Sequence, residues 1–311
     1  MTNLLAIFYN GPKILMTAST PLAERIQRFY DTSSPLWEKT WGEHMHHGYY
    51  GRNGQHRKDR RQAQIDLIEE LLKWADITTA QTILDVGCGI GGSTLYLARK
   101  FDAQAVGITL SPVQAKRAGE RAAEKGIDLL AYENFATAHA PAVQFQVTNA
   151  LSTPFPDNAF DFVWSMESGE HMPDKPGFLR ECYRVLKPGG TFLMATWCHR
   201  PTHTLAGPLT DSESQHLDRL YELYHLPYVI SLDSYGGLAQ EVGFTDVRMA
   251  DWSRQVEFFW QDVVRSALNI EAVAGILQAG EETIRGTAAI ALMTTGFNRG
   301  LIRYGILSGS K

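Results

Sequence analysis

Short apolar runs alternate with amphipathic stretches along most of the chain. The runs have strand length, and turn-forming residues bound them, as is typical of buried strands. The stretches between them carry apolar residues at helical spacing, for example Ile65, Ile68 and Leu72. This pattern predicts strands over residues 82–86, 103–110, 143–148, 159–165, 191–197, 244–252 and 301–307. It predicts helices over residues 20–30, 59–75, 111–125, 174–186, 211–225 and 231–242, and a helix-rich region over 256–299.

Strands that alternate with helices indicate a parallel sheet with helices on both faces. We therefore predict an α/β fold with a doubly wound, mostly parallel, seven-stranded sheet. Residues 19–311 are expected to form a single domain after a flexible segment over residues 1–18. Helical insertions over about 199–243 and 253–300 are expected to cap the strand ends, where ligands bind in such sheets.

The segment over residues 37–51 holds an unusual density of aromatic residues and histidines. His44, His46 and His47 could ligate a metal, but no cysteine or spaced histidine pair accompanies them. We therefore favour an aromatic lid packed over a bound ligand.

Composition narrows the class of partner. The 311 residues are 44% apolar and carry a formal net charge of −5, which does not favour a nucleic-acid partner. The three cysteines, at 88, 182 and 198, lack metal-ligand spacing and are expected to be reduced thiols of a cytoplasmic protein. The apolar run over residues 4–9 is too short to span a membrane, although it could touch a membrane surface.

The stretch over residues 82–92 is the most informative. Apolar residues lead into Asp85, glycines follow at 87, 89, 91 and 92, and a helical pattern then begins. Such a strand, glycine turn and helix let a ligand lie on bare backbone beside free helix N–H groups. A P-loop would need Gly-Lys-Ser/Thr, and a dinucleotide fingerprint would need Gly-x-Gly-x-x-Gly with a later acid. The remaining alternative is a tight turn that binds no ligand.

This pattern resembles the first motif of the S-adenosylmethionine (SAM) methyltransferases with a doubly wound sheet. Farther along, Thr109 and Leu110 with Gln114 resemble the branch that contains cyclopropane-fatty-acid and mycolate synthases. Thr109 and Gln114 can hydrogen-bond hydroxyl groups without a charge. The resemblance implies SAM contacts from Asp85, Gly87, Cys88, Gly89, Thr109, Leu110, Gln114, Asn149, Ala150, Met166, Tyr49 and Tyr50. Ordinary packing at the strand ends is the alternative for each.

A second informative stretch, residues 164–173, follows the fourth predicted strand, where the reacting centre is expected. It contains Glu167, Glu170 and His171, and such carboxylates and imidazoles can act as general bases. We favour His171 with Glu170 as the catalytic pair and give Glu167 less weight. A Glu–His pair that only fixes the loop is the alternative. His46 or His47, reaching in from the aromatic segment, is a further candidate base.

Several motifs resemble the γ-tocopherol methyltransferase family of cyanobacteria and plastids. They lie over residues 41–50, 59–64, 168–173, 195–201 and 226–228. The resemblance covers about residues 20–311, although the insertion around 126–141 departs from the family. It implies methyl transfer from SAM to an aromatic ring carbon of γ-tocopherol, or similarly of δ-tocopherol, in vitamin E biosynthesis, with no metal.

Other acceptors stay open, because plant relatives with this scaffold methylate alkaloid nitrogens. The alternatives are a small amine, a prenylated quinol precursor, or SAM binding without catalysis. The resemblance implies a small lipophilic acceptor, no nucleic acid, and peripheral contact with a membrane such as the thylakoid. Nothing in the pattern fixes the oligomeric state.

Overall fold

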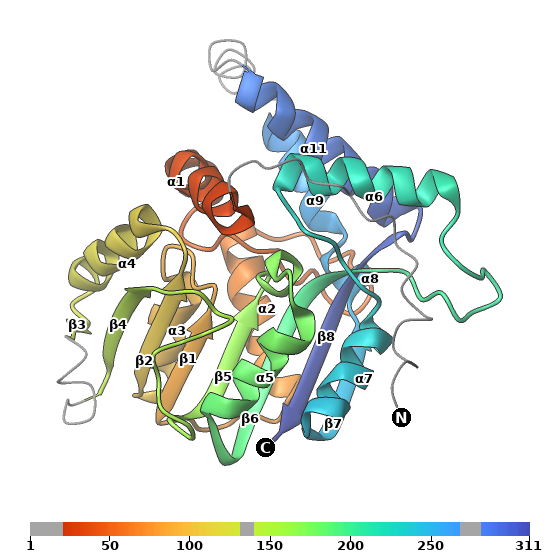
Figure 1. Cartoon of the computed structure of the whole chain (residues 1–311). Helices are drawn as coiled ribbons and strands as arrows, with labels where there is room; N and C mark the ends of the chain where they lie inside the picture. Colours follow the sequence, from red (N-terminus) through yellow and green to blue (C-terminus); the bar gives the residue numbers. More distant parts are fainter. Residues whose placement is uncertain (1–20, 131–139, 268–280) are drawn as a thin grey trace.

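One eight-stranded sheet forms the centre of the computed structural model, which describes residues 21–130, 140–267 and 281–311 (Figure 1). The strands lie side by side in the order β3-β4-β2-β1-β5-β6-β8-β7. Their bounds are β1 (Thr82–Val86), β2 (Gln104–Thr109), β3 (Asp128–Leu129), β4 (Ala142–Val147), β5 (Phe160–Met166), β6 (Leu186–His199), β7 (Thr245–Asp251) and β8 (Ile302–Ser310). The chain order reverses between β1 and β5, and ligands bind at such a switch point in doubly wound sheets.

The sheet is mostly parallel, as predicted. Every neighbouring pair from β3 to β6 is parallel, whereas β8 runs antiparallel to both β6 and β7. The sheet has one strand more than the predicted seven, because the two-residue β3 pairs with the edge of β4. This strand lies in the insertion at 126–141, where no strand pattern is visible in the sequence, and residues 131–139 fall outside the described part.

Helices cover both faces of the sheet. In Figure 1, α5 and α7 lie in front of the strands, and α2 and α3 lie behind them. The helices are α1 (Leu22–Trp41), α2 (Arg60–Trp74), α3 (Gly92–Phe101), α4 (Pro112–Glu124), α5 (Lys175–Val185), α6 (Asp211–Tyr224), α7 (Leu232–Val242), α8 (Ser253–Val256), α9 (Phe258–Ala267) and α11 (Glu281–Asn298). Polar caps mark several starts, for example Asp59, whose side chain accepts from the Gln62 N–H.

Alternate strand residues face the two helical layers. Ile83 and Trp164 belong to the core on the side of α2 and α3, whereas Leu84 and Val163 belong to the core beneath α5 and α7. This two-sided burial explains why the strands read as continuous apolar runs in the sequence.

A cap lies above the carboxyl ends of the strands, formed by α1, α6, α9 and α11 at the top of Figure 1. Helix α1 is longer than the predicted 20–30 because its aromatic face continues beyond Pro35. Phe29 packs edge-on against Trp37, and Trp37 stacks on Trp41 with ring centroids 5.5 Å apart. Of the first predicted insertion, α6 joins the cap, while α7 packs on the sheet through Tyr235.

Strand β6 begins at Leu186, directly after α5, and is therefore longer than the predicted strand over residues 191–197. The expected flexible segment over residues 1–18 and part of the second insertion, residues 268–280, lie outside the described residues. Among the helices that are described, none combines the length and apolarity needed to cross a membrane.

Candidate active site

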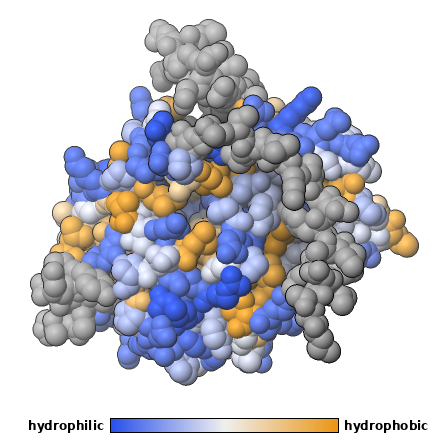
Figure 2. All heavy atoms as spheres, in the orientation of Figure 1, coloured by the Kyte–Doolittle hydropathy of each residue, from blue (hydrophilic) through white to orange (hydrophobic). Residues whose placement is uncertain are grey.

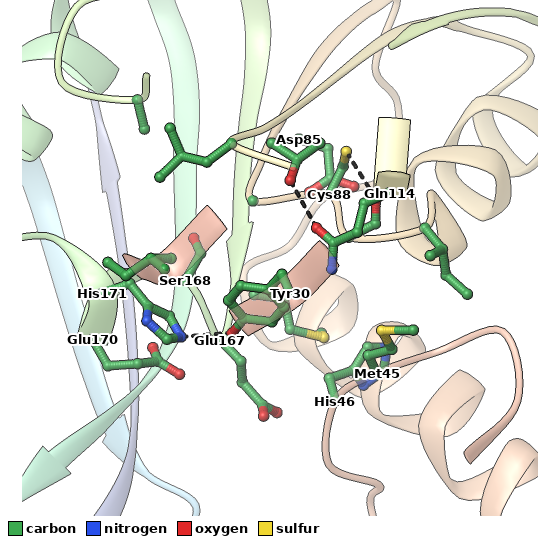
Figure 3. Close-up of a pocket in the computed structure, with 18 of the residues that line it drawn as sticks. Tyr30, Met45, His46, Asp85, Cys88, Gln114, Glu167, Ser168, Glu170 and His171 are labelled. Atoms are coloured by element: carbon green, nitrogen blue, oxygen red, sulfur yellow. Dashed lines mark hydrogen bonds between the residues drawn. The ribbon is translucent and has the colours of Figure 1, made fainter. Parts of the chain in front are cut away.

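The carboxyl ends of the central strands border one pocket beneath α1 and the cap, with a cavity of about 200 Å³. Figure 3 shows side chains from α1, the aromatic segment, the glycine turn and the loop after β5 around this cavity. Thirteen of the residues predicted from sequence line it: His46, Asp85, Gly87, Cys88, Gly89, Thr109, Leu110, Gln114, Asn149, Ala150, Met166, Glu170 and His171. The structure therefore brings together segments from five places in the chain.

Tyr49 and Tyr50 are not among the described residues that line this pocket. Their backbone turns away, because Tyr49 N–H donates to Ala63 O at 2.7 Å and Tyr50 N–H donates to Gln255 O at 2.8 Å. Tyr50 is fully buried, with its ring 5.0 Å from that of Phe258. The structure places both tyrosines between α2 and the region of α8 and α9, and their expected contact with SAM stays a prediction.

The glycine turn after β1 is shaped by close backbone approaches. Gly87 has φ +83°, and a Cβ atom there would lie 2.3 Å from the Ser168 Cβ in the loop after β5. Gly91, with φ +81°, precedes α3, whose first N–H groups have no partner within the helix. Only glycine permits such left-handed, closely packed backbone without strain. The turn therefore presents backbone rather than side chains to the pocket.

Asp85 lies at the end of β1 and is 1% exposed. Its carboxylate accepts a hydrogen bond from Thr94 Oγ1 at 2.6 Å. Burial raises the pKa of Asp85 to about 7, although the hydrogen bonds from Thr94 act in the opposite direction. A cationic ligand in the pocket would favour the ionised carboxylate.

A hydroxyl–amide pair follows β2. Thr109 Oγ1 donates to Gln114 Oε1 at 2.7 Å, and Gln114 Nε2 donates to Ser34 Oγ of α1 at 3.0 Å. Ser111 caps α4 by accepting from the Gln114 N–H at 3.0 Å. Together, a buried carboxylate, the N-terminus of α3 and this pair fit the charged methionyl part and the ribose hydroxyls of SAM.

Glu167, in the loop after β5, has φ +51°, an uncommon conformation for a residue other than glycine. Its carboxylate accepts from the His47 N–H at 2.7 Å and the Tyr304 hydroxyl at 2.9 Å, and it pairs with His47 Nδ1 at 2.9 Å. Burial raises the pKa of Glu167, but the charge and hydrogen bonds of His47 bring it below its ordinary value. The pocket thus contains a carboxylate that stays ionised.

Glu170 and His171 lie in a short 3₁₀ turn, η2 (Gly169–His171). Glu170 Oε2 accepts from Thr196 Oγ1 at 2.7 Å. Burial, with the charge of Glu167, raises the pKa of Glu170 to about 8. Burial also lowers the pKa of His171 to about 3, so its imidazole is neutral at pH 7. The two side chains are therefore a mostly protonated carboxyl and a neutral hydrogen-bond acceptor.

Lys175, at the start of α5, binds the backbone of this turn. Its buried Nζ donates to the carbonyls of Gly169 at 2.8 Å and Glu170 at 2.9 Å, and it lies 4.9 Å from the centre of the Tyr228 ring. Tyr235 donates a further hydrogen bond to the Gly169 carbonyl at 3.2 Å. Sequence reasoning missed Lys175, because nothing in its spacing separates it from an ordinary first-turn lysine of α5.

Tyr30 is a second residue that sequence reasoning missed. Its hydroxyl donates to His171 Nε2 at 2.7 Å across 141 positions of sequence. The same face of α1 carries Ser34, which contacts Gln114. The i, i+4 spacing of Tyr30 and Ser34 indicates a shared face, but not which part of the molecule that face meets.

The pocket also has an aromatic end, with Trp197, Tyr224, Phe259 and Trp260 in its wall. His46 borders it, donates to the His47 carbonyl at 2.7 Å, and has its pKa lowered by burial. Its Nε2 has no hydrogen-bond partner among the described residues. Within the same part of the chain, no three metal-ligating side chains cluster. This end suits a largely apolar ring with few polar groups.

Comparison with known proteins identifies the family to which this chain is similar. Residues 84–194 match the family model described as a methyltransferase domain. The chloroplastic tocopherol O-methyltransferase of Arabidopsis thaliana is 41% identical over 304 residues, which cover 95% of this chain and 84% of that protein. The 2-methyl-6-phytyl-1,4-hydroquinone methyltransferase of Synechocystis is 33% identical, over 95% of this chain and 90% of that protein.

Among solved structures, the [4+2]-cyclase SpnF superposes with a TM-score of 0.73 at 25% identity, over 94% of this chain and 97% of that one. The matched family model spans the strand, glycine turn and helix that fit SAM, together with the loop carrying Glu170 and His171. The extent of these likenesses and the pocket geometry lead to one conclusion: the chain belongs to the tocopherol methyltransferase family of SAM-dependent methyltransferases.

Proposed function

We propose that this enzyme transfers the methyl group of SAM to an aromatic ring carbon of γ-tocopherol, giving α-tocopherol, and of δ-tocopherol, giving β-tocopherol. One observation carries the proposal: a single pocket joins the SAM-fitting turn to an aromatic end with His171, Glu170 and Glu167 in its wall. That combination suits an apolar ring bearing a phenolic hydroxyl. The likeness to a tocopherol O-methyltransferase supports the same acceptor.

The turn after β1 and the start of α4 would hold SAM, which when bound supplies an electrophilic methyl group on a sulfonium. Asp85 would face its positive charge, and Thr109 with Gln114 would bind its hydroxyl groups. Asn149, Ala150 and Met166 form the neighbouring wall. Fixing the acceptor beside the donor supplies much of the rate acceleration, because alignment removes the entropic cost of the encounter.

The acceptor ring becomes more nucleophilic when its phenol loses a proton, and the methylated ring carbon must then lose its own proton. We infer that His171 Nε2 accepts the hydrogen bond of the phenol and that Glu170 is the stronger base of the pair. A carboxyl with a pKa of about 8 is closer to a phenol near 10 than an imidazole with a pKa of about 3. His46, whose Nε2 is without a partner among the described residues, is the alternative base.

Two other acceptors are distinguishable from tocopherol. A prenylated quinol has the same phenolic chemistry, and the Synechocystis relative is named for one. A small amine would instead need a counter-charge, and Glu167, with its lowered pKa, could supply it. The aromatic wall around Trp197 and Trp260 favours the larger, apolar phenols.

The lipophilic character of the acceptor also indicates where the protein would meet it. The acceptor would be a small lipophilic molecule, and we propose that the protein meets it at a membrane surface from the cytoplasmic or plastid-stromal side. Figure 2 shows apolar side chains gathered over α1 and α4, and Leu36 and Val113 on these helices are 53% and 39% exposed. Sedimentation with lipid vesicles tests this contact.

The deciding experiment incubates purified protein with methyl-labelled SAM and, separately, γ-tocopherol, a 2-methyl-6-phytyl-quinol and a panel of amines. The proposal expects label in γ-tocopherol, located on the ring carbon by NMR of the product. Label only in an amine, or label found as a methoxy group, would contradict it. The Asp85→Asn variant serves as the control with impaired SAM binding.

A further inference from the structure

We propose that the side chain of Tyr30 occupies the subsite for the acceptor's phenolic hydroxyl, so that the acceptor must displace it to reach His171. The inference rests on the proposed function, because it takes the acceptor to be a phenol. It makes Tyr30 a determinant of acceptor affinity rather than a group that reacts.

The contact between Tyr30 and His171 is the one that a phenolic acceptor would make. The Tyr30 hydroxyl donates to Nε2 at 2.7 Å, and the two rings meet edge to face with centroids 5.4 Å apart. Figure 3 shows the Tyr30 ring inside the pocket, between His171 and the side of Met45 and Gln114. The phenol ring of an acceptor differs from the phenol ring of Tyr30 only in its other substituents.

The protonation states agree with a hydrogen bond and not with proton transfer. Burial, aided by the charges of Glu170 and Glu167, raises the pKa of Tyr30 well above its ordinary value, so it stays a donor. With Tyr30 as the donor, the neutral His171 accepts at Nε2 and carries its ring proton on Nδ1. That Nδ1 atom is buried without a partner among the described residues. Tyr30 is thus an inert occupant at neutral pH.

The small volume of the cavity is a second reason to expect that the acceptor displaces Tyr30. Its cavity of about 200 Å³ is below the roughly 300–1,000 Å³ of sites that enclose small ligands. Figure 3 places the Tyr30 ring directly beside His171, so moving it enlarges the region that a substituted ring must enter to reach His171.

Helix α1 holds Tyr30 in place through contacts on either side. Asp31 accepts from Ser111 Oγ at 2.5 Å, Ser34 accepts from Gln114 Nε2 at 3.0 Å, and Glu38 pairs with Arg117. These contacts tie α1 to the start of α4 without involving the Tyr30 side chain. The ring can therefore leave His171 while the helix keeps its attachment.

Steady-state kinetics of Tyr30→Phe with γ-tocopherol tests the proposal, because this change removes only the hydroxyl. Losing one neutral hydrogen bond that competes with the acceptor should lower the acceptor KM by about two- to tenfold. The kcat should stay within about twofold, and SAM affinity should not change. Tyr183→Phe is the matched control, since Tyr183 packs against Phe244 and Lys311 away from the pocket. Unchanged kinetics in Tyr30→Phe would overturn the proposal, as would a tenfold loss of kcat at constant KM.

A binding measurement separates this inference from the proposed function. Titration of wild type and Tyr30→Phe with p-cresol, followed by tryptophan fluorescence, needs no turnover. Tighter p-cresol binding by the variant supports the phenol subsite even if tocopherol is not methylated. Equal affinities would overturn the subsite even if tocopherol is the acceptor.

Discussion

His47 holds the Glu167 carboxylate twice, through its backbone N–H at 2.7 Å and its ring Nδ1 at 2.9 Å. This contact joins the aromatic segment before α2 to the loop after β5, and Tyr304 of β8 adds a third donor at 2.9 Å. The left-handed backbone of Glu167 is thereby fixed by partners from two distant parts of the chain. Such over-determination is what allows an unfavourable conformation to persist at a functional site.

We expect Glu167→Gln to lower the free energy of unfolding by about 1–3 kcal/mol, because it leaves a buried donor without an acceptor. Urea denaturation at pH 7 measures this, and Glu120→Gln at an exposed ion pair is the control. Since the pKa of Glu167 is lowered in the folded state, its stabilisation is present above its ordinary value of 4.5 and is lost as the pH falls below it. The gap between wild type and variant should therefore narrow in acid; a gap that persists unchanged would refute the charge argument.

Asp85 should make SAM binding depend on pH. Because its pKa is about 7 in the free protein, SAM must bind a population that is only partly ionised. The affinity for SAM should therefore fall as the pH drops from 7.5 to 6. Well below the pKa of Asp85, the loss of affinity should approach tenfold per pH unit. Calorimetry over this range tests the expectation. In Asp85→Asn the binding should be weaker and this dependence should disappear; a dependence that survives would place the titrating group elsewhere.

Glu170 should make kcat increase as the pH rises above 7. Its carboxyl has a pKa of about 8, so the fraction able to act as a base rises between pH 7 and 9. We expect kcat to increase over this interval in wild type and to lose that rise in Glu170→Gln. His171→Ala should retain SAM affinity and lose about 10²–10⁴-fold in kcat. If His46→Ala shows that loss while Glu170→Gln and His171→Ala do not, the base is His46.

Lys175 should act as a positioning residue for the turn at 169–171. Replacing it by Met removes the donor to two carbonyls while keeping most of the buried volume. We expect kcat to fall at least tenfold with SAM affinity unchanged, because the turn then orients Glu170 and His171 less well. Lys175→Arg should recover part of the rate. A fall in SAM affinity that accounts for the whole loss of activity would show a general structural role instead.

Tyr50→Phe should leave SAM affinity and turnover intact. The Tyr50 hydroxyl is buried with no hydrogen-bond partner among the described residues, so removing it relieves an unsatisfied polar group. The midpoint of urea unfolding should therefore stay the same or rise. Weaker SAM binding in this variant would restore the lid role that the sequence suggested for Tyr50.

Local patterns predicted one half of the pocket better than the other. Asp85, Gly87, Thr109 and Gln114 lie within strand–turn–helix units, so their spacing in the sequence already determines their place in space. The contact of Tyr30 with His171 joins positions 141 apart, and no short motif encodes it.

The positions of Tyr49 and Tyr50 were hard to predict for a related reason. They directly follow His46 and His47, which do line the pocket, but hydrogen bonds to Ala63 and Gln255 turn their backbone into the core. Adjacency in sequence therefore did not predict which of these residues line the pocket.

The antiparallel insertion of β8 between β6 and β7 has a consequence for how the protein is made. During synthesis β7 emerges before β8, yet its hydrogen-bonded neighbour in the sheet is β8 alone. Until β8 arrives, β6 presents an open edge of the kind that promotes association between nascent chains. Tyr304, which contacts Glu167, arrives on the same strand. The loop after β5 can therefore reach its final arrangement only after translation has passed β8, and a ribosome stalled earlier would hold an aggregation-prone, incompletely folded intermediate.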